Sequence, residues 1–275
     1  MFEFKRFLKA ITPPVLISLI RRIKKLIVQQ EIWSGEYSTW ADAEVFCTGY
    51  NSPIILKKCR TSLLKVKSGE AVYERDSVLF DEIQYSWGLL AGLQKAAFEN
   101  DGNLSVLDFG GSLGSTYFQN REFLSSLKGL RWCIVEQTHF VECGQKDFES
   151  DQLKFYYTVE ECLEHNDPNV LLLSSVLQYL EKPHQWLERL LSFRFPTVIL
   201  DRTSFVENET DILTIQNVPS SIYEASYPAW FFGSNTRKKI VDKYKYVIPF
   251  KGDVETSAII NNTHQVYWGG LILKL

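Results

Sequence analysis

Apolar runs of strand length alternate with amphipathic stretches through the second half of the chain. Between the runs, apolar positions recur at roughly helical spacing, as they do over residues 116–127. Strands that alternate with helices predict a parallel sheet with helices on both faces. We therefore expect an α/β domain over residues 101–275. Its first five strands are expected at residues 105–107, 132–135, 153–157, 169–173 and 196–200.

The pattern after residue 200 predicts the end of the same sheet. A helix is expected near residues 236–243, and two strands at 246–250 and 265–273. A long connection at residues 205–230 precedes them, and a connection of this length in a compact domain usually has a function. Because it follows the fifth strand, we expect it on the carboxyl-end side of the sheet, where open α/β sheets bind ligands.

Residues 31–100 have the pattern of a mainly helical extension. The longest helix is expected over residues 77–98, with Asp76 or Ser77 as its N-cap. Just before it, residues 73–76 combine an aromatic side chain with charged ones. Two interpretations stay open for this segment: a solvated helix start, or part of a lid over a ligand site.

Residues 1–30 form a basic amphipathic segment. Within residues 1–28, seven Lys and Arg stand against Glu3 alone, which gives a local charge of +6 in a chain of net charge −3. The longest uncharged run, residues 10–20, is far shorter than the roughly 20 apolar residues that span a bilayer. The segment is interpreted either as an interfacial helix on an anionic membrane or as a helix packed on its own domain or on a dimer partner.

The composition narrows the function classes. The 275 residues, 45% of them hydrophobic, suffice for one sizeable core and an appendage. A net charge of −3 gives no general affinity for nucleic acid, so none is expected as a partner. Five scattered cysteines without a C-x-x-C pair indicate a reducing compartment, and we expect a cytoplasmic protein. The histidines and cysteines show no metal-ligand spacing, so no metal site is expected.

The stretch V-L-D-F-G-G-S-L-G-S at residues 106–115 carries the strongest ligand signal. Asp108 ends the first strand, a glycine-rich turn follows, and the next helix begins after it. Glycine permits a sharp turn and the close approach of a ligand, and a helix start offers unpaired N–H groups. An acid directly before the turn would repel a pyrophosphate but suits a cation, such as the ammonium and sulfonium of S-adenosylmethionine. A tight turn without a ligand is the alternative.

A second acid follows at the place where nucleotide-binding βαβ units bind ribose. Glu136 ends the strand at 132–135 and lies 22 positions after Gly114. An acid at about this distance hydrogen-bonds the ribose hydroxyls in such units, whereas a solvated strand-end carboxylate is the alternative. The fourth strand runs into Ser174 and Ser175, which we expect beside the same ligand.

Several segments together resemble a known family. The D-F-G-G-S-L-G turn resembles the first motif of class I S-adenosylmethionine-dependent methyltransferases, with Ser112 where the G-x-G-x-G pattern has its middle glycine. Over most of its length, the sequence is similar to a group of bacterial methyltransferases associated with surface-polysaccharide biosynthesis. The segments that carry this similarity are W-S-G-E-Y-S-T-W-A-D-A, T-G-Y, Y-E-R-D-S-V-L-F, L-D-F-G-G-S-L-G-S, W-C-I-V-E-Q and D-R-T.

The resemblance implies a fold, a cofactor and a class of acceptor. The fold is a Rossmann-like class I methyltransferase sheet, mostly parallel, of seven strands with the last one antiparallel. The cofactor is S-adenosylmethionine, and the acceptor is a small molecule or a glycan, namely a surface-polysaccharide sugar or its precursor. The residues expected to bind the cofactor are Asp108, Gly110, Gly111, Ser112, Gly114, Glu136, Gln137, Ser174 and Ser175.

The candidate catalytic residues follow the fourth and fifth strands: Gln178, Asp201 and Arg202. Methyl transfer from a sulfonium is a direct displacement, so an enzyme must align donor and acceptor and, for a poor nucleophile, remove a proton. In a dry site Asp201 would accept that proton, and Arg202 offers a planar donor fork to a carboxylate or phosphate. The alternative for Asp201 and Arg202 is a strand-end ion pair that ties down the connection.

Two other function classes share part of this pattern. A nicotinamide-dependent oxidoreductase has the same strand, turn and ribose acid, but we find neither its G-x-G-x-x-G motif nor a catalytic Tyr–Lys pair in the sequence. A non-catalytic membrane-associated scaffold would use the basic N-terminus, but the intact Asp108, glycines and Glu136 speak against it. We expect a cytoplasmic methyltransferase, located at the inner face of the membrane if residues 1–28 bind lipid.

Overall fold

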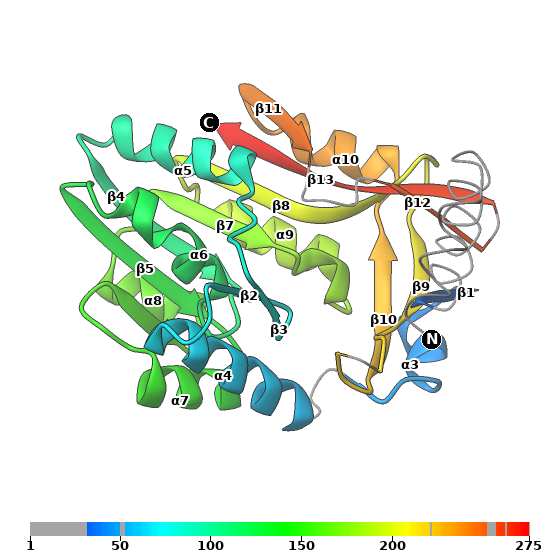
Figure 1. Cartoon of the computed structure of the whole chain (residues 1–275). Helices are drawn as coiled ribbons and strands as arrows, with labels where there is room; N and C mark the ends of the chain where they lie inside the picture. The colour runs from blue at the N-terminus through cyan, green and yellow to red at the C-terminus, as the bar shows by residue number, and fades with distance from the viewer. Residues whose placement is uncertain (1–31, 50–52, 221, 252–256, 262, 275) are drawn as a thin grey trace, which may run out of the picture.

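The computed structural model describes residues 32–49, 53–220, 222–251, 257–261 and 263–274. Its largest element is an eight-stranded sheet (Figure 1), in which seven strands follow the order β11-β13-β8-β7-β4-β5-β6 and β12 pairs with β13. The strands are β4 (Asn103–Phe109), β5 (Gly129–Val135), β6 (Leu153–Tyr156), β7 (Val170–Ser174), β8 (Thr197–Val206), β11 (Tyr246–Lys251), β12 (Ala258–Ile260) and β13 (His264–Lys274).

The strand directions confirm the expected Rossmann-like class I methyltransferase sheet. Strands β4 to β8 are parallel to one another. Strand β13 runs antiparallel between β8 and β11. Each of the expected strands overlaps an observed one, and β8 continues well beyond residue 200 to Val206. The parallel strands therefore end at one edge, where their carboxyl ends can build a site.

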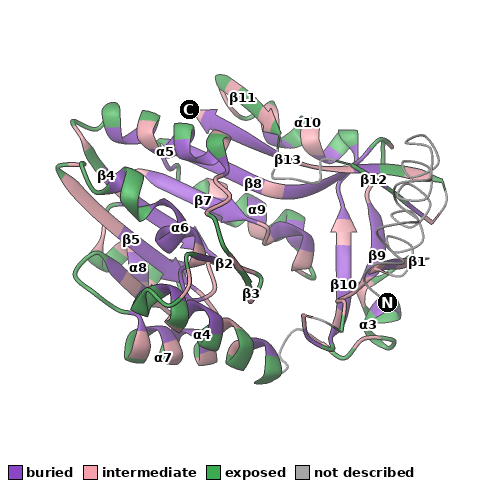
Figure 2. Ribbon diagram, in the orientation of Figure 1, coloured by how far each residue is buried: buried purple, intermediate pink, exposed green. Residues whose placement is uncertain are grey.

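Helices cover both faces of this sheet. Neighbouring side chains of a strand point to opposite faces, so Val106 of β4 packs in the core on one face and Leu107 in the core on the other. Figure 2 shows that β7 and β8 are mostly buried between these layers. The first core includes α4 (Pro53–Ser68), α5 (Trp87–Phe98), α6 (Ser115–Leu124) and α7 (Thr138–Asp147), and the second includes α8 (Val159–His165), α9 (Pro183–Ser192) and α10 (Ser234–Val241).

A β-hairpin replaces the first part of the helix that was expected over residues 77–98. Strands β2 (Tyr73–Arg75) and β3 (Val78–Phe80) pair antiparallel, and α5 begins only after its N-cap residue Ser86. Asp76 and Ser77 have φ angles of 51° and 69°, as two-residue hairpin turns require. The prediction that one of them caps a helix is therefore wrong. The rings of Tyr73 and Phe80 lie 5.6 Å apart across the hairpin and stabilise the pairing.

A second, three-stranded sheet joins the start of the described chain to its C-terminal part. β1 (Trp33–Tyr37) pairs antiparallel with β9 (Ile212–Asn217), and β9 pairs antiparallel with β10 (Ser226–Phe231). The connection expected at residues 205–230 therefore contains the end of β8 and two further strands. The extension at residues 31–100 is mainly helical, with α3 (Trp40–Glu44), α4 and α5, but it also contributes β1 and the hairpin.

The N-terminal segment stays a prediction, because residues 1–28 lie outside the described residues. Within the described ranges, every helix is too short or too polar to cross a bilayer. A short 3-10 turn, η1 (Leu177–Tyr179), follows β7 and leads toward α9. The small sheet of β1, β9 and β10 lies beside the large sheet (Figure 1).

Candidate functional site

The glycine-rich turn after β4 has the backbone of a tight ligand-binding corner. Gly110 and Gly114 have φ angles of 73° and 103°, and α6 begins directly after Gly114. Ser112 adopts a φ of 53°, so it keeps the left-handed conformation that a glycine at this position of the pattern would adopt easily. A Cβ atom on Gly111 would come within 2.5 Å of the Asp108 carboxyl group. The turn therefore needs a residue without a side chain at Gly111 in order to pass over Asp108.

The carboxyl group of Asp108 is buried beside the indole of Trp132. The Asp108 side chain is 1% exposed, and Oδ2 accepts a hydrogen bond from Nε1 of Trp132 at 3.0 Å. Within the described residues, Oδ1 has no hydrogen-bond partner. Burial raises the pKa of Asp108 to about 7, although the Trp132 hydrogen bond and the Arg202 charge lower it. A buried acceptor without a donor costs free energy, so this atom is suited to a ligand that brings an N–H group.

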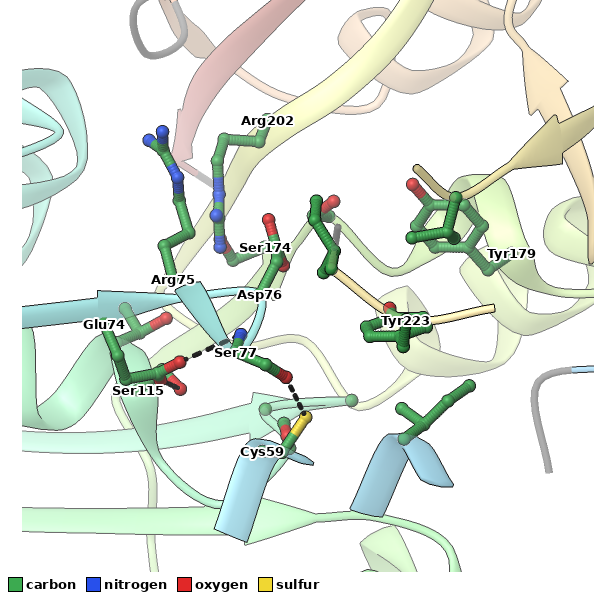
Figure 3. A pocket seen from close by; sticks show the side chains of 18 of the residues that line it. Cys59, Glu74, Arg75, Asp76, Ser77, Ser115, Ser174, Tyr179, Arg202 and Tyr223 are labelled. Atoms are coloured by element: carbon green, nitrogen blue, oxygen red, sulfur yellow. Dashed lines mark hydrogen bonds between the residues drawn. The ribbon is translucent and has the colours of Figure 1, made fainter. Parts of the chain in front are cut away.

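Asp108 lines a cavity of about 180 Å³ at the carboxyl ends of β4 and β7, beside Arg202 in β8. The hairpin, α4 and the β9–β10 turn close this cavity on its other sides (Figure 3). Among the described residues, no group of three or more His, Cys, Asp or Glu side chains could hold a metal ion. The predicted site residues that line the cavity are Asp108, Gly110, Gly111, Ser112, Ser174, Ser175 and Arg202.

A neighbouring cavity of about 310 Å³ is lined by Glu136, the predicted ribose residue, and by Gln137, a predicted cofactor residue. Gly110, Ser175 and Tyr179 line both cavities, so the two spaces adjoin between the glycine-rich turn and η1. Glu136 is half-buried, and its Oε2 accepts the backbone N–H of Gln137 at 2.6 Å. Burial raises the pKa of Glu136 to about 6, while the backbone N–H groups of Gln137 and Ser112 lower it. The two predicted acids thus lie in adjoining cavities.

Asp201 and Arg202 are brought together, but only Arg202 reaches the cavity wall. Asp201 is 1% exposed; its Oδ1 accepts from Ser86 Oγ at 3.0 Å, and its Oδ2 accepts from Ser174 Oγ at 2.9 Å. Nε of Arg202 lies 3.5 Å from Asp201 Oδ2, and Nη2 of Arg202 donates to Ser174 Oγ at 3.2 Å. Asp201 is therefore placed to orient Arg202 and Ser174.

Gln178 is buried, and its side-chain amide binds two neighbouring residues. Its Nε2 donates to Ser175 Oγ at 3.1 Å and to the backbone oxygen of Arg202 at 3.0 Å. Arg202 has a φ of 48° and Ser175 a φ of 55°, which are unusual for residues with side chains. Gln178 thus holds two constrained residues, Ser175 just after β7 and Arg202 within β8, and it does not line the cavity.

The hairpin contributes a carboxylate that the sequence analysis did not single out. Glu74 is 3% exposed and lines the cavity. It accepts hydrogen bonds from Oγ of Ser115, at the start of α6, and from the backbone N–H of Ser77 at 3.1 Å. Burial raises the pKa of Glu74 to about 7, against the lowering effects of these hydrogen bonds and of the Arg202 charge. Its only sequence signal is the charged segment 73–76, for which a lid was one interpretation.

No protein-family model and no curated protein sequence matches this chain. Among solved structures, the chain is similar to the N-terminal domain of EvdMO1, solved in the presence of SAH and D-fucose (10% identity; 78% of this chain and 96% of that chain covered; TM-score 0.48). It is also similar to SAM-bound CalS10, an amino pentose methyltransferase from Micromonospora echinaspora (8%; 69% and 92%; 0.41). A third is the SAM-bound magnesium protoporphyrin IX methyltransferase ChlM from Synechocystis PCC 6803 (14%; 81% and 86%; 0.38).

Proposed function

We propose that this protein is an S-adenosylmethionine-dependent methyltransferase. The observation that carries the proposal is Asp108, a cavity-lining residue whose buried Oδ1 has no hydrogen-bond donor among the described residues. The ammonium group of the methionine part of S-adenosylmethionine is a donor of the required charge. Gly111 supports the fit, because any side chain there would collide with the Asp108 carboxyl group.

The other proposed cofactor-binding residues are assigned to parts of the cofactor according to which of the two adjoining cavities they line. Gly110, Gly111, Ser112 and Ser174 line the cavity with Asp108, and we assign them to the methionine part. Gly114 is the N-cap of α6, whose first two residues, Ser115 and Thr116, line the cavity. Glu136 and Gln137 line the neighbouring cavity and are assigned to the ribose, with Ser175 between the two parts.

The bound cofactor would supply a methyl group on a sulfonium, and the protein would hold the acceptor in line with it. Positioning of this kind lowers barriers by several kcal/mol, up to about 7–11 in the best intramolecular models. Arg202 lines the cavity beside Ser174, and we place it where donor and acceptor meet. Asp201 and Gln178 are positioning residues for Arg202, because they bind its side chain and its backbone oxygen.

The acceptor proposed for this site is a small molecule or a glycan. The sequence resemblance favours a surface-polysaccharide sugar or its precursor in a bacterial cytoplasm. The scattered cysteines, which are all free, favour the same reducing compartment. Residues 1–28 would add contact with the inner face of an anionic membrane. Against the oxidoreductase alternative, the Asp108 carboxylate lies where a dinucleotide pyrophosphate would have to bind.

Calorimetric titration of the full chain with S-adenosylmethionine, S-adenosylhomocysteine and NAD tests the proposal. We expect both sulfur compounds to bind and NAD not to bind. Binding of NAD alone would favour the oxidoreductase alternative. Binding of none of the three compounds would favour the non-catalytic membrane-associated scaffold. Transfer of a labelled methyl group to extracted glycans or to nucleotide-sugar precursors would then identify the acceptor.

A further inference from the structure

The side of the cavity away from the glycine-rich turn is uncharged and largely aromatic. Figure 3 shows Glu74, Arg75 and Arg202 on one side of the cavity and Tyr179 and Tyr223 on the other. The residues that line this second side come from α4, η1, β9, the β9–β10 turn and β10. We call the tyrosine-bearing part the tyrosine wall: Tyr179, Gln216, Tyr223 and Tyr227.

The tyrosine wall is a preformed surface rather than a set of mobile side chains. Tyr223 is 7% exposed and Tyr227 is 6% exposed. The hydroxyl of Tyr179 donates to Oε1 of Gln216 at 2.8 Å. The rings of Tyr179 and Tyr227 meet edge to face, with centroids 5.3 Å apart. Aromatic walls with a few fixed polar groups are typical of sites for small ligands, and rings held in this way bind flat molecular faces at little cost in entropy.

One carboxylate from the hairpin lies close to this wall. Asp76 occupies the tip of the β2–β3 hairpin, is exposed, and lines the cavity. Burial is the main cause that raises the pKa of Tyr223 to about 12 and that of Tyr179 as well, and the negative charge of Asp76 adds to both shifts. An ionised carboxylate only accepts hydrogen bonds. A ligand on the tyrosine wall is therefore favoured if it offers a donor at its edge and carries no negative charge there.

We propose that the tyrosine wall and Asp76 form the acceptor subsite, and that the acceptor is an uncharged, hydroxyl-bearing ring compound. Its apolar face packs against Tyr223 and Tyr227, and a hydroxyl at its edge donates to Asp76. This inference rests on the proposed methyltransferase function, because the methyl donor is assigned to the opposite, charged side of the cavity. Saccharide rings and phenols share this chemistry, and the experiment separates the two.

The experiment is a ligand-observed NMR titration of the full chain loaded with S-adenosylhomocysteine. The neutral probes are methyl β-D-glucopyranoside and catechol, and their anionic counterparts are methyl β-D-glucuronide and 3,4-dihydroxybenzoate. The test variant is Asp76→Asn, since asparagine tolerates the φ of 51° at this position. Asp81→Asn is the matched control, because Asp81 is exposed just beyond the hairpin and does not line the cavity. Tyr223→Leu removes both the ring and its hydroxyl, whereas Tyr223→Phe removes only the hydroxyl, so the two variants distinguish the contributions of ring and hydroxyl to binding.

We expect one neutral probe to bind more tightly than its anionic counterpart, and the class of that probe identifies the acceptor as a saccharide or a phenol. Asp76→Asn should weaken its binding about tenfold, the usual effect of losing a hydrogen bond to a charged group, while Asp81→Asn has no effect. Tyr223→Leu should weaken it and Tyr223→Phe should not. Tighter binding of the anionic probes, unchanged affinity in Asp76→Asn, or no binding of a neutral probe to the loaded protein would overturn the subsite. Failure to bind S-adenosylhomocysteine, measured first by calorimetry, would instead overturn the proposed function.

Discussion

Nε1 of Trp132 donates a hydrogen bond to Oδ2 of Asp108 at 3.0 Å, across the neighbouring parallel strands β4 and β5. This bond fixes the orientation of a carboxyl group that is 1% exposed. Oδ1 of the same carboxyl group has no donor among the described residues, and we propose that the cofactor supplies one. The indole of Trp132 is itself fully buried, so the carboxyl group cannot turn away without leaving the indole N–H unpaired.

Asp108→Asn should therefore weaken the binding of S-adenosylmethionine by about 1.5–3 kcal/mol, the usual cost of losing a charged hydrogen bond. Calorimetry measures the affinity, and thermal unfolding shows that the fold is kept. Asp101→Asn, in the exposed turn before β4, is the matched control. If Asp108→Asn binds as tightly as the parent protein, the ammonium group is not held at Asp108.

The raised pKa of Asp108 also predicts how cofactor binding depends on pH. Its pKa of about 7 means that the carboxyl group is largely protonated below pH 7. Because a cationic ligand favours the ionised form, binding must release this proton at low pH and not at high pH. The affinity should be constant above pH 7 and fall by up to tenfold per pH unit below it. Calorimetry between pH 5.5 and about 8.5 tests this, and in Asp108→Asn the slope should be reduced.

Local sequence patterns were sufficient to predict the parallel sheet and the tight glycine-rich turn after β4. Asp108 and Glu136 each end an apolar run, and parallel neighbours bring such ends to one edge. The hairpin could not be predicted in this way, because Asp76 and Ser77 adopt positive φ angles without being glycine. Its stability comes from tertiary contacts such as the hydrogen bond between Glu74 and Ser115, 41 residues apart.

The tyrosine wall also depends on long-range pairing. Trp33 in β1 lies opposite Gln216 in β9, although most of the chain separates them. No periodicity within residues 205–230 reveals a partner so far away in the sequence. The long connection alone indicated a functional segment there, but it could not show which of its side chains face the cavity.

The ribose assignment predicts a similar loss for a second acid. Glu136→Ala should weaken cofactor binding by about 1.5–3 kcal/mol, because it removes charged hydrogen bonds to the ribose hydroxyls. S-adenosylmethionine and S-adenosylhomocysteine share the ribose, so calorimetry should give the same loss for both. Glu142→Ala, an exposed acid on α7, serves as the control. Unchanged affinity in Glu136→Ala, with the fold intact, would mean that this acid is only a solvated strand end.

The basic N-terminal segment should bind anionic membranes. Each Lys or Arg near the surface adds about 1 kcal/mol at low salt, and residues 1–28 carry seven of them. Sedimentation with vesicles that contain phosphatidylserine should retain the full chain and lose a variant that lacks residues 1–28, and salt should weaken the difference. Equal partitioning of the two forms would favour packing of the segment on protein.

The different places of Asp201 and Arg202 predict that substitutions at the two residues have different effects. Asp201 accepts hydrogen bonds from Ser86 and Ser174, and an asparagine cannot accept both through its amide nitrogen. Asp201→Asn should therefore lower the free energy of unfolding by about 1–3 kcal/mol, measured by urea unfolding, and Ser86→Ala should reproduce part of this loss. Arg202→Gln, at the cavity wall, should keep the stability and the affinity for S-adenosylhomocysteine but lose methyl transfer. An Asp201→Asn protein as stable as the parent would contradict this structural role of the Asp201 carboxylate.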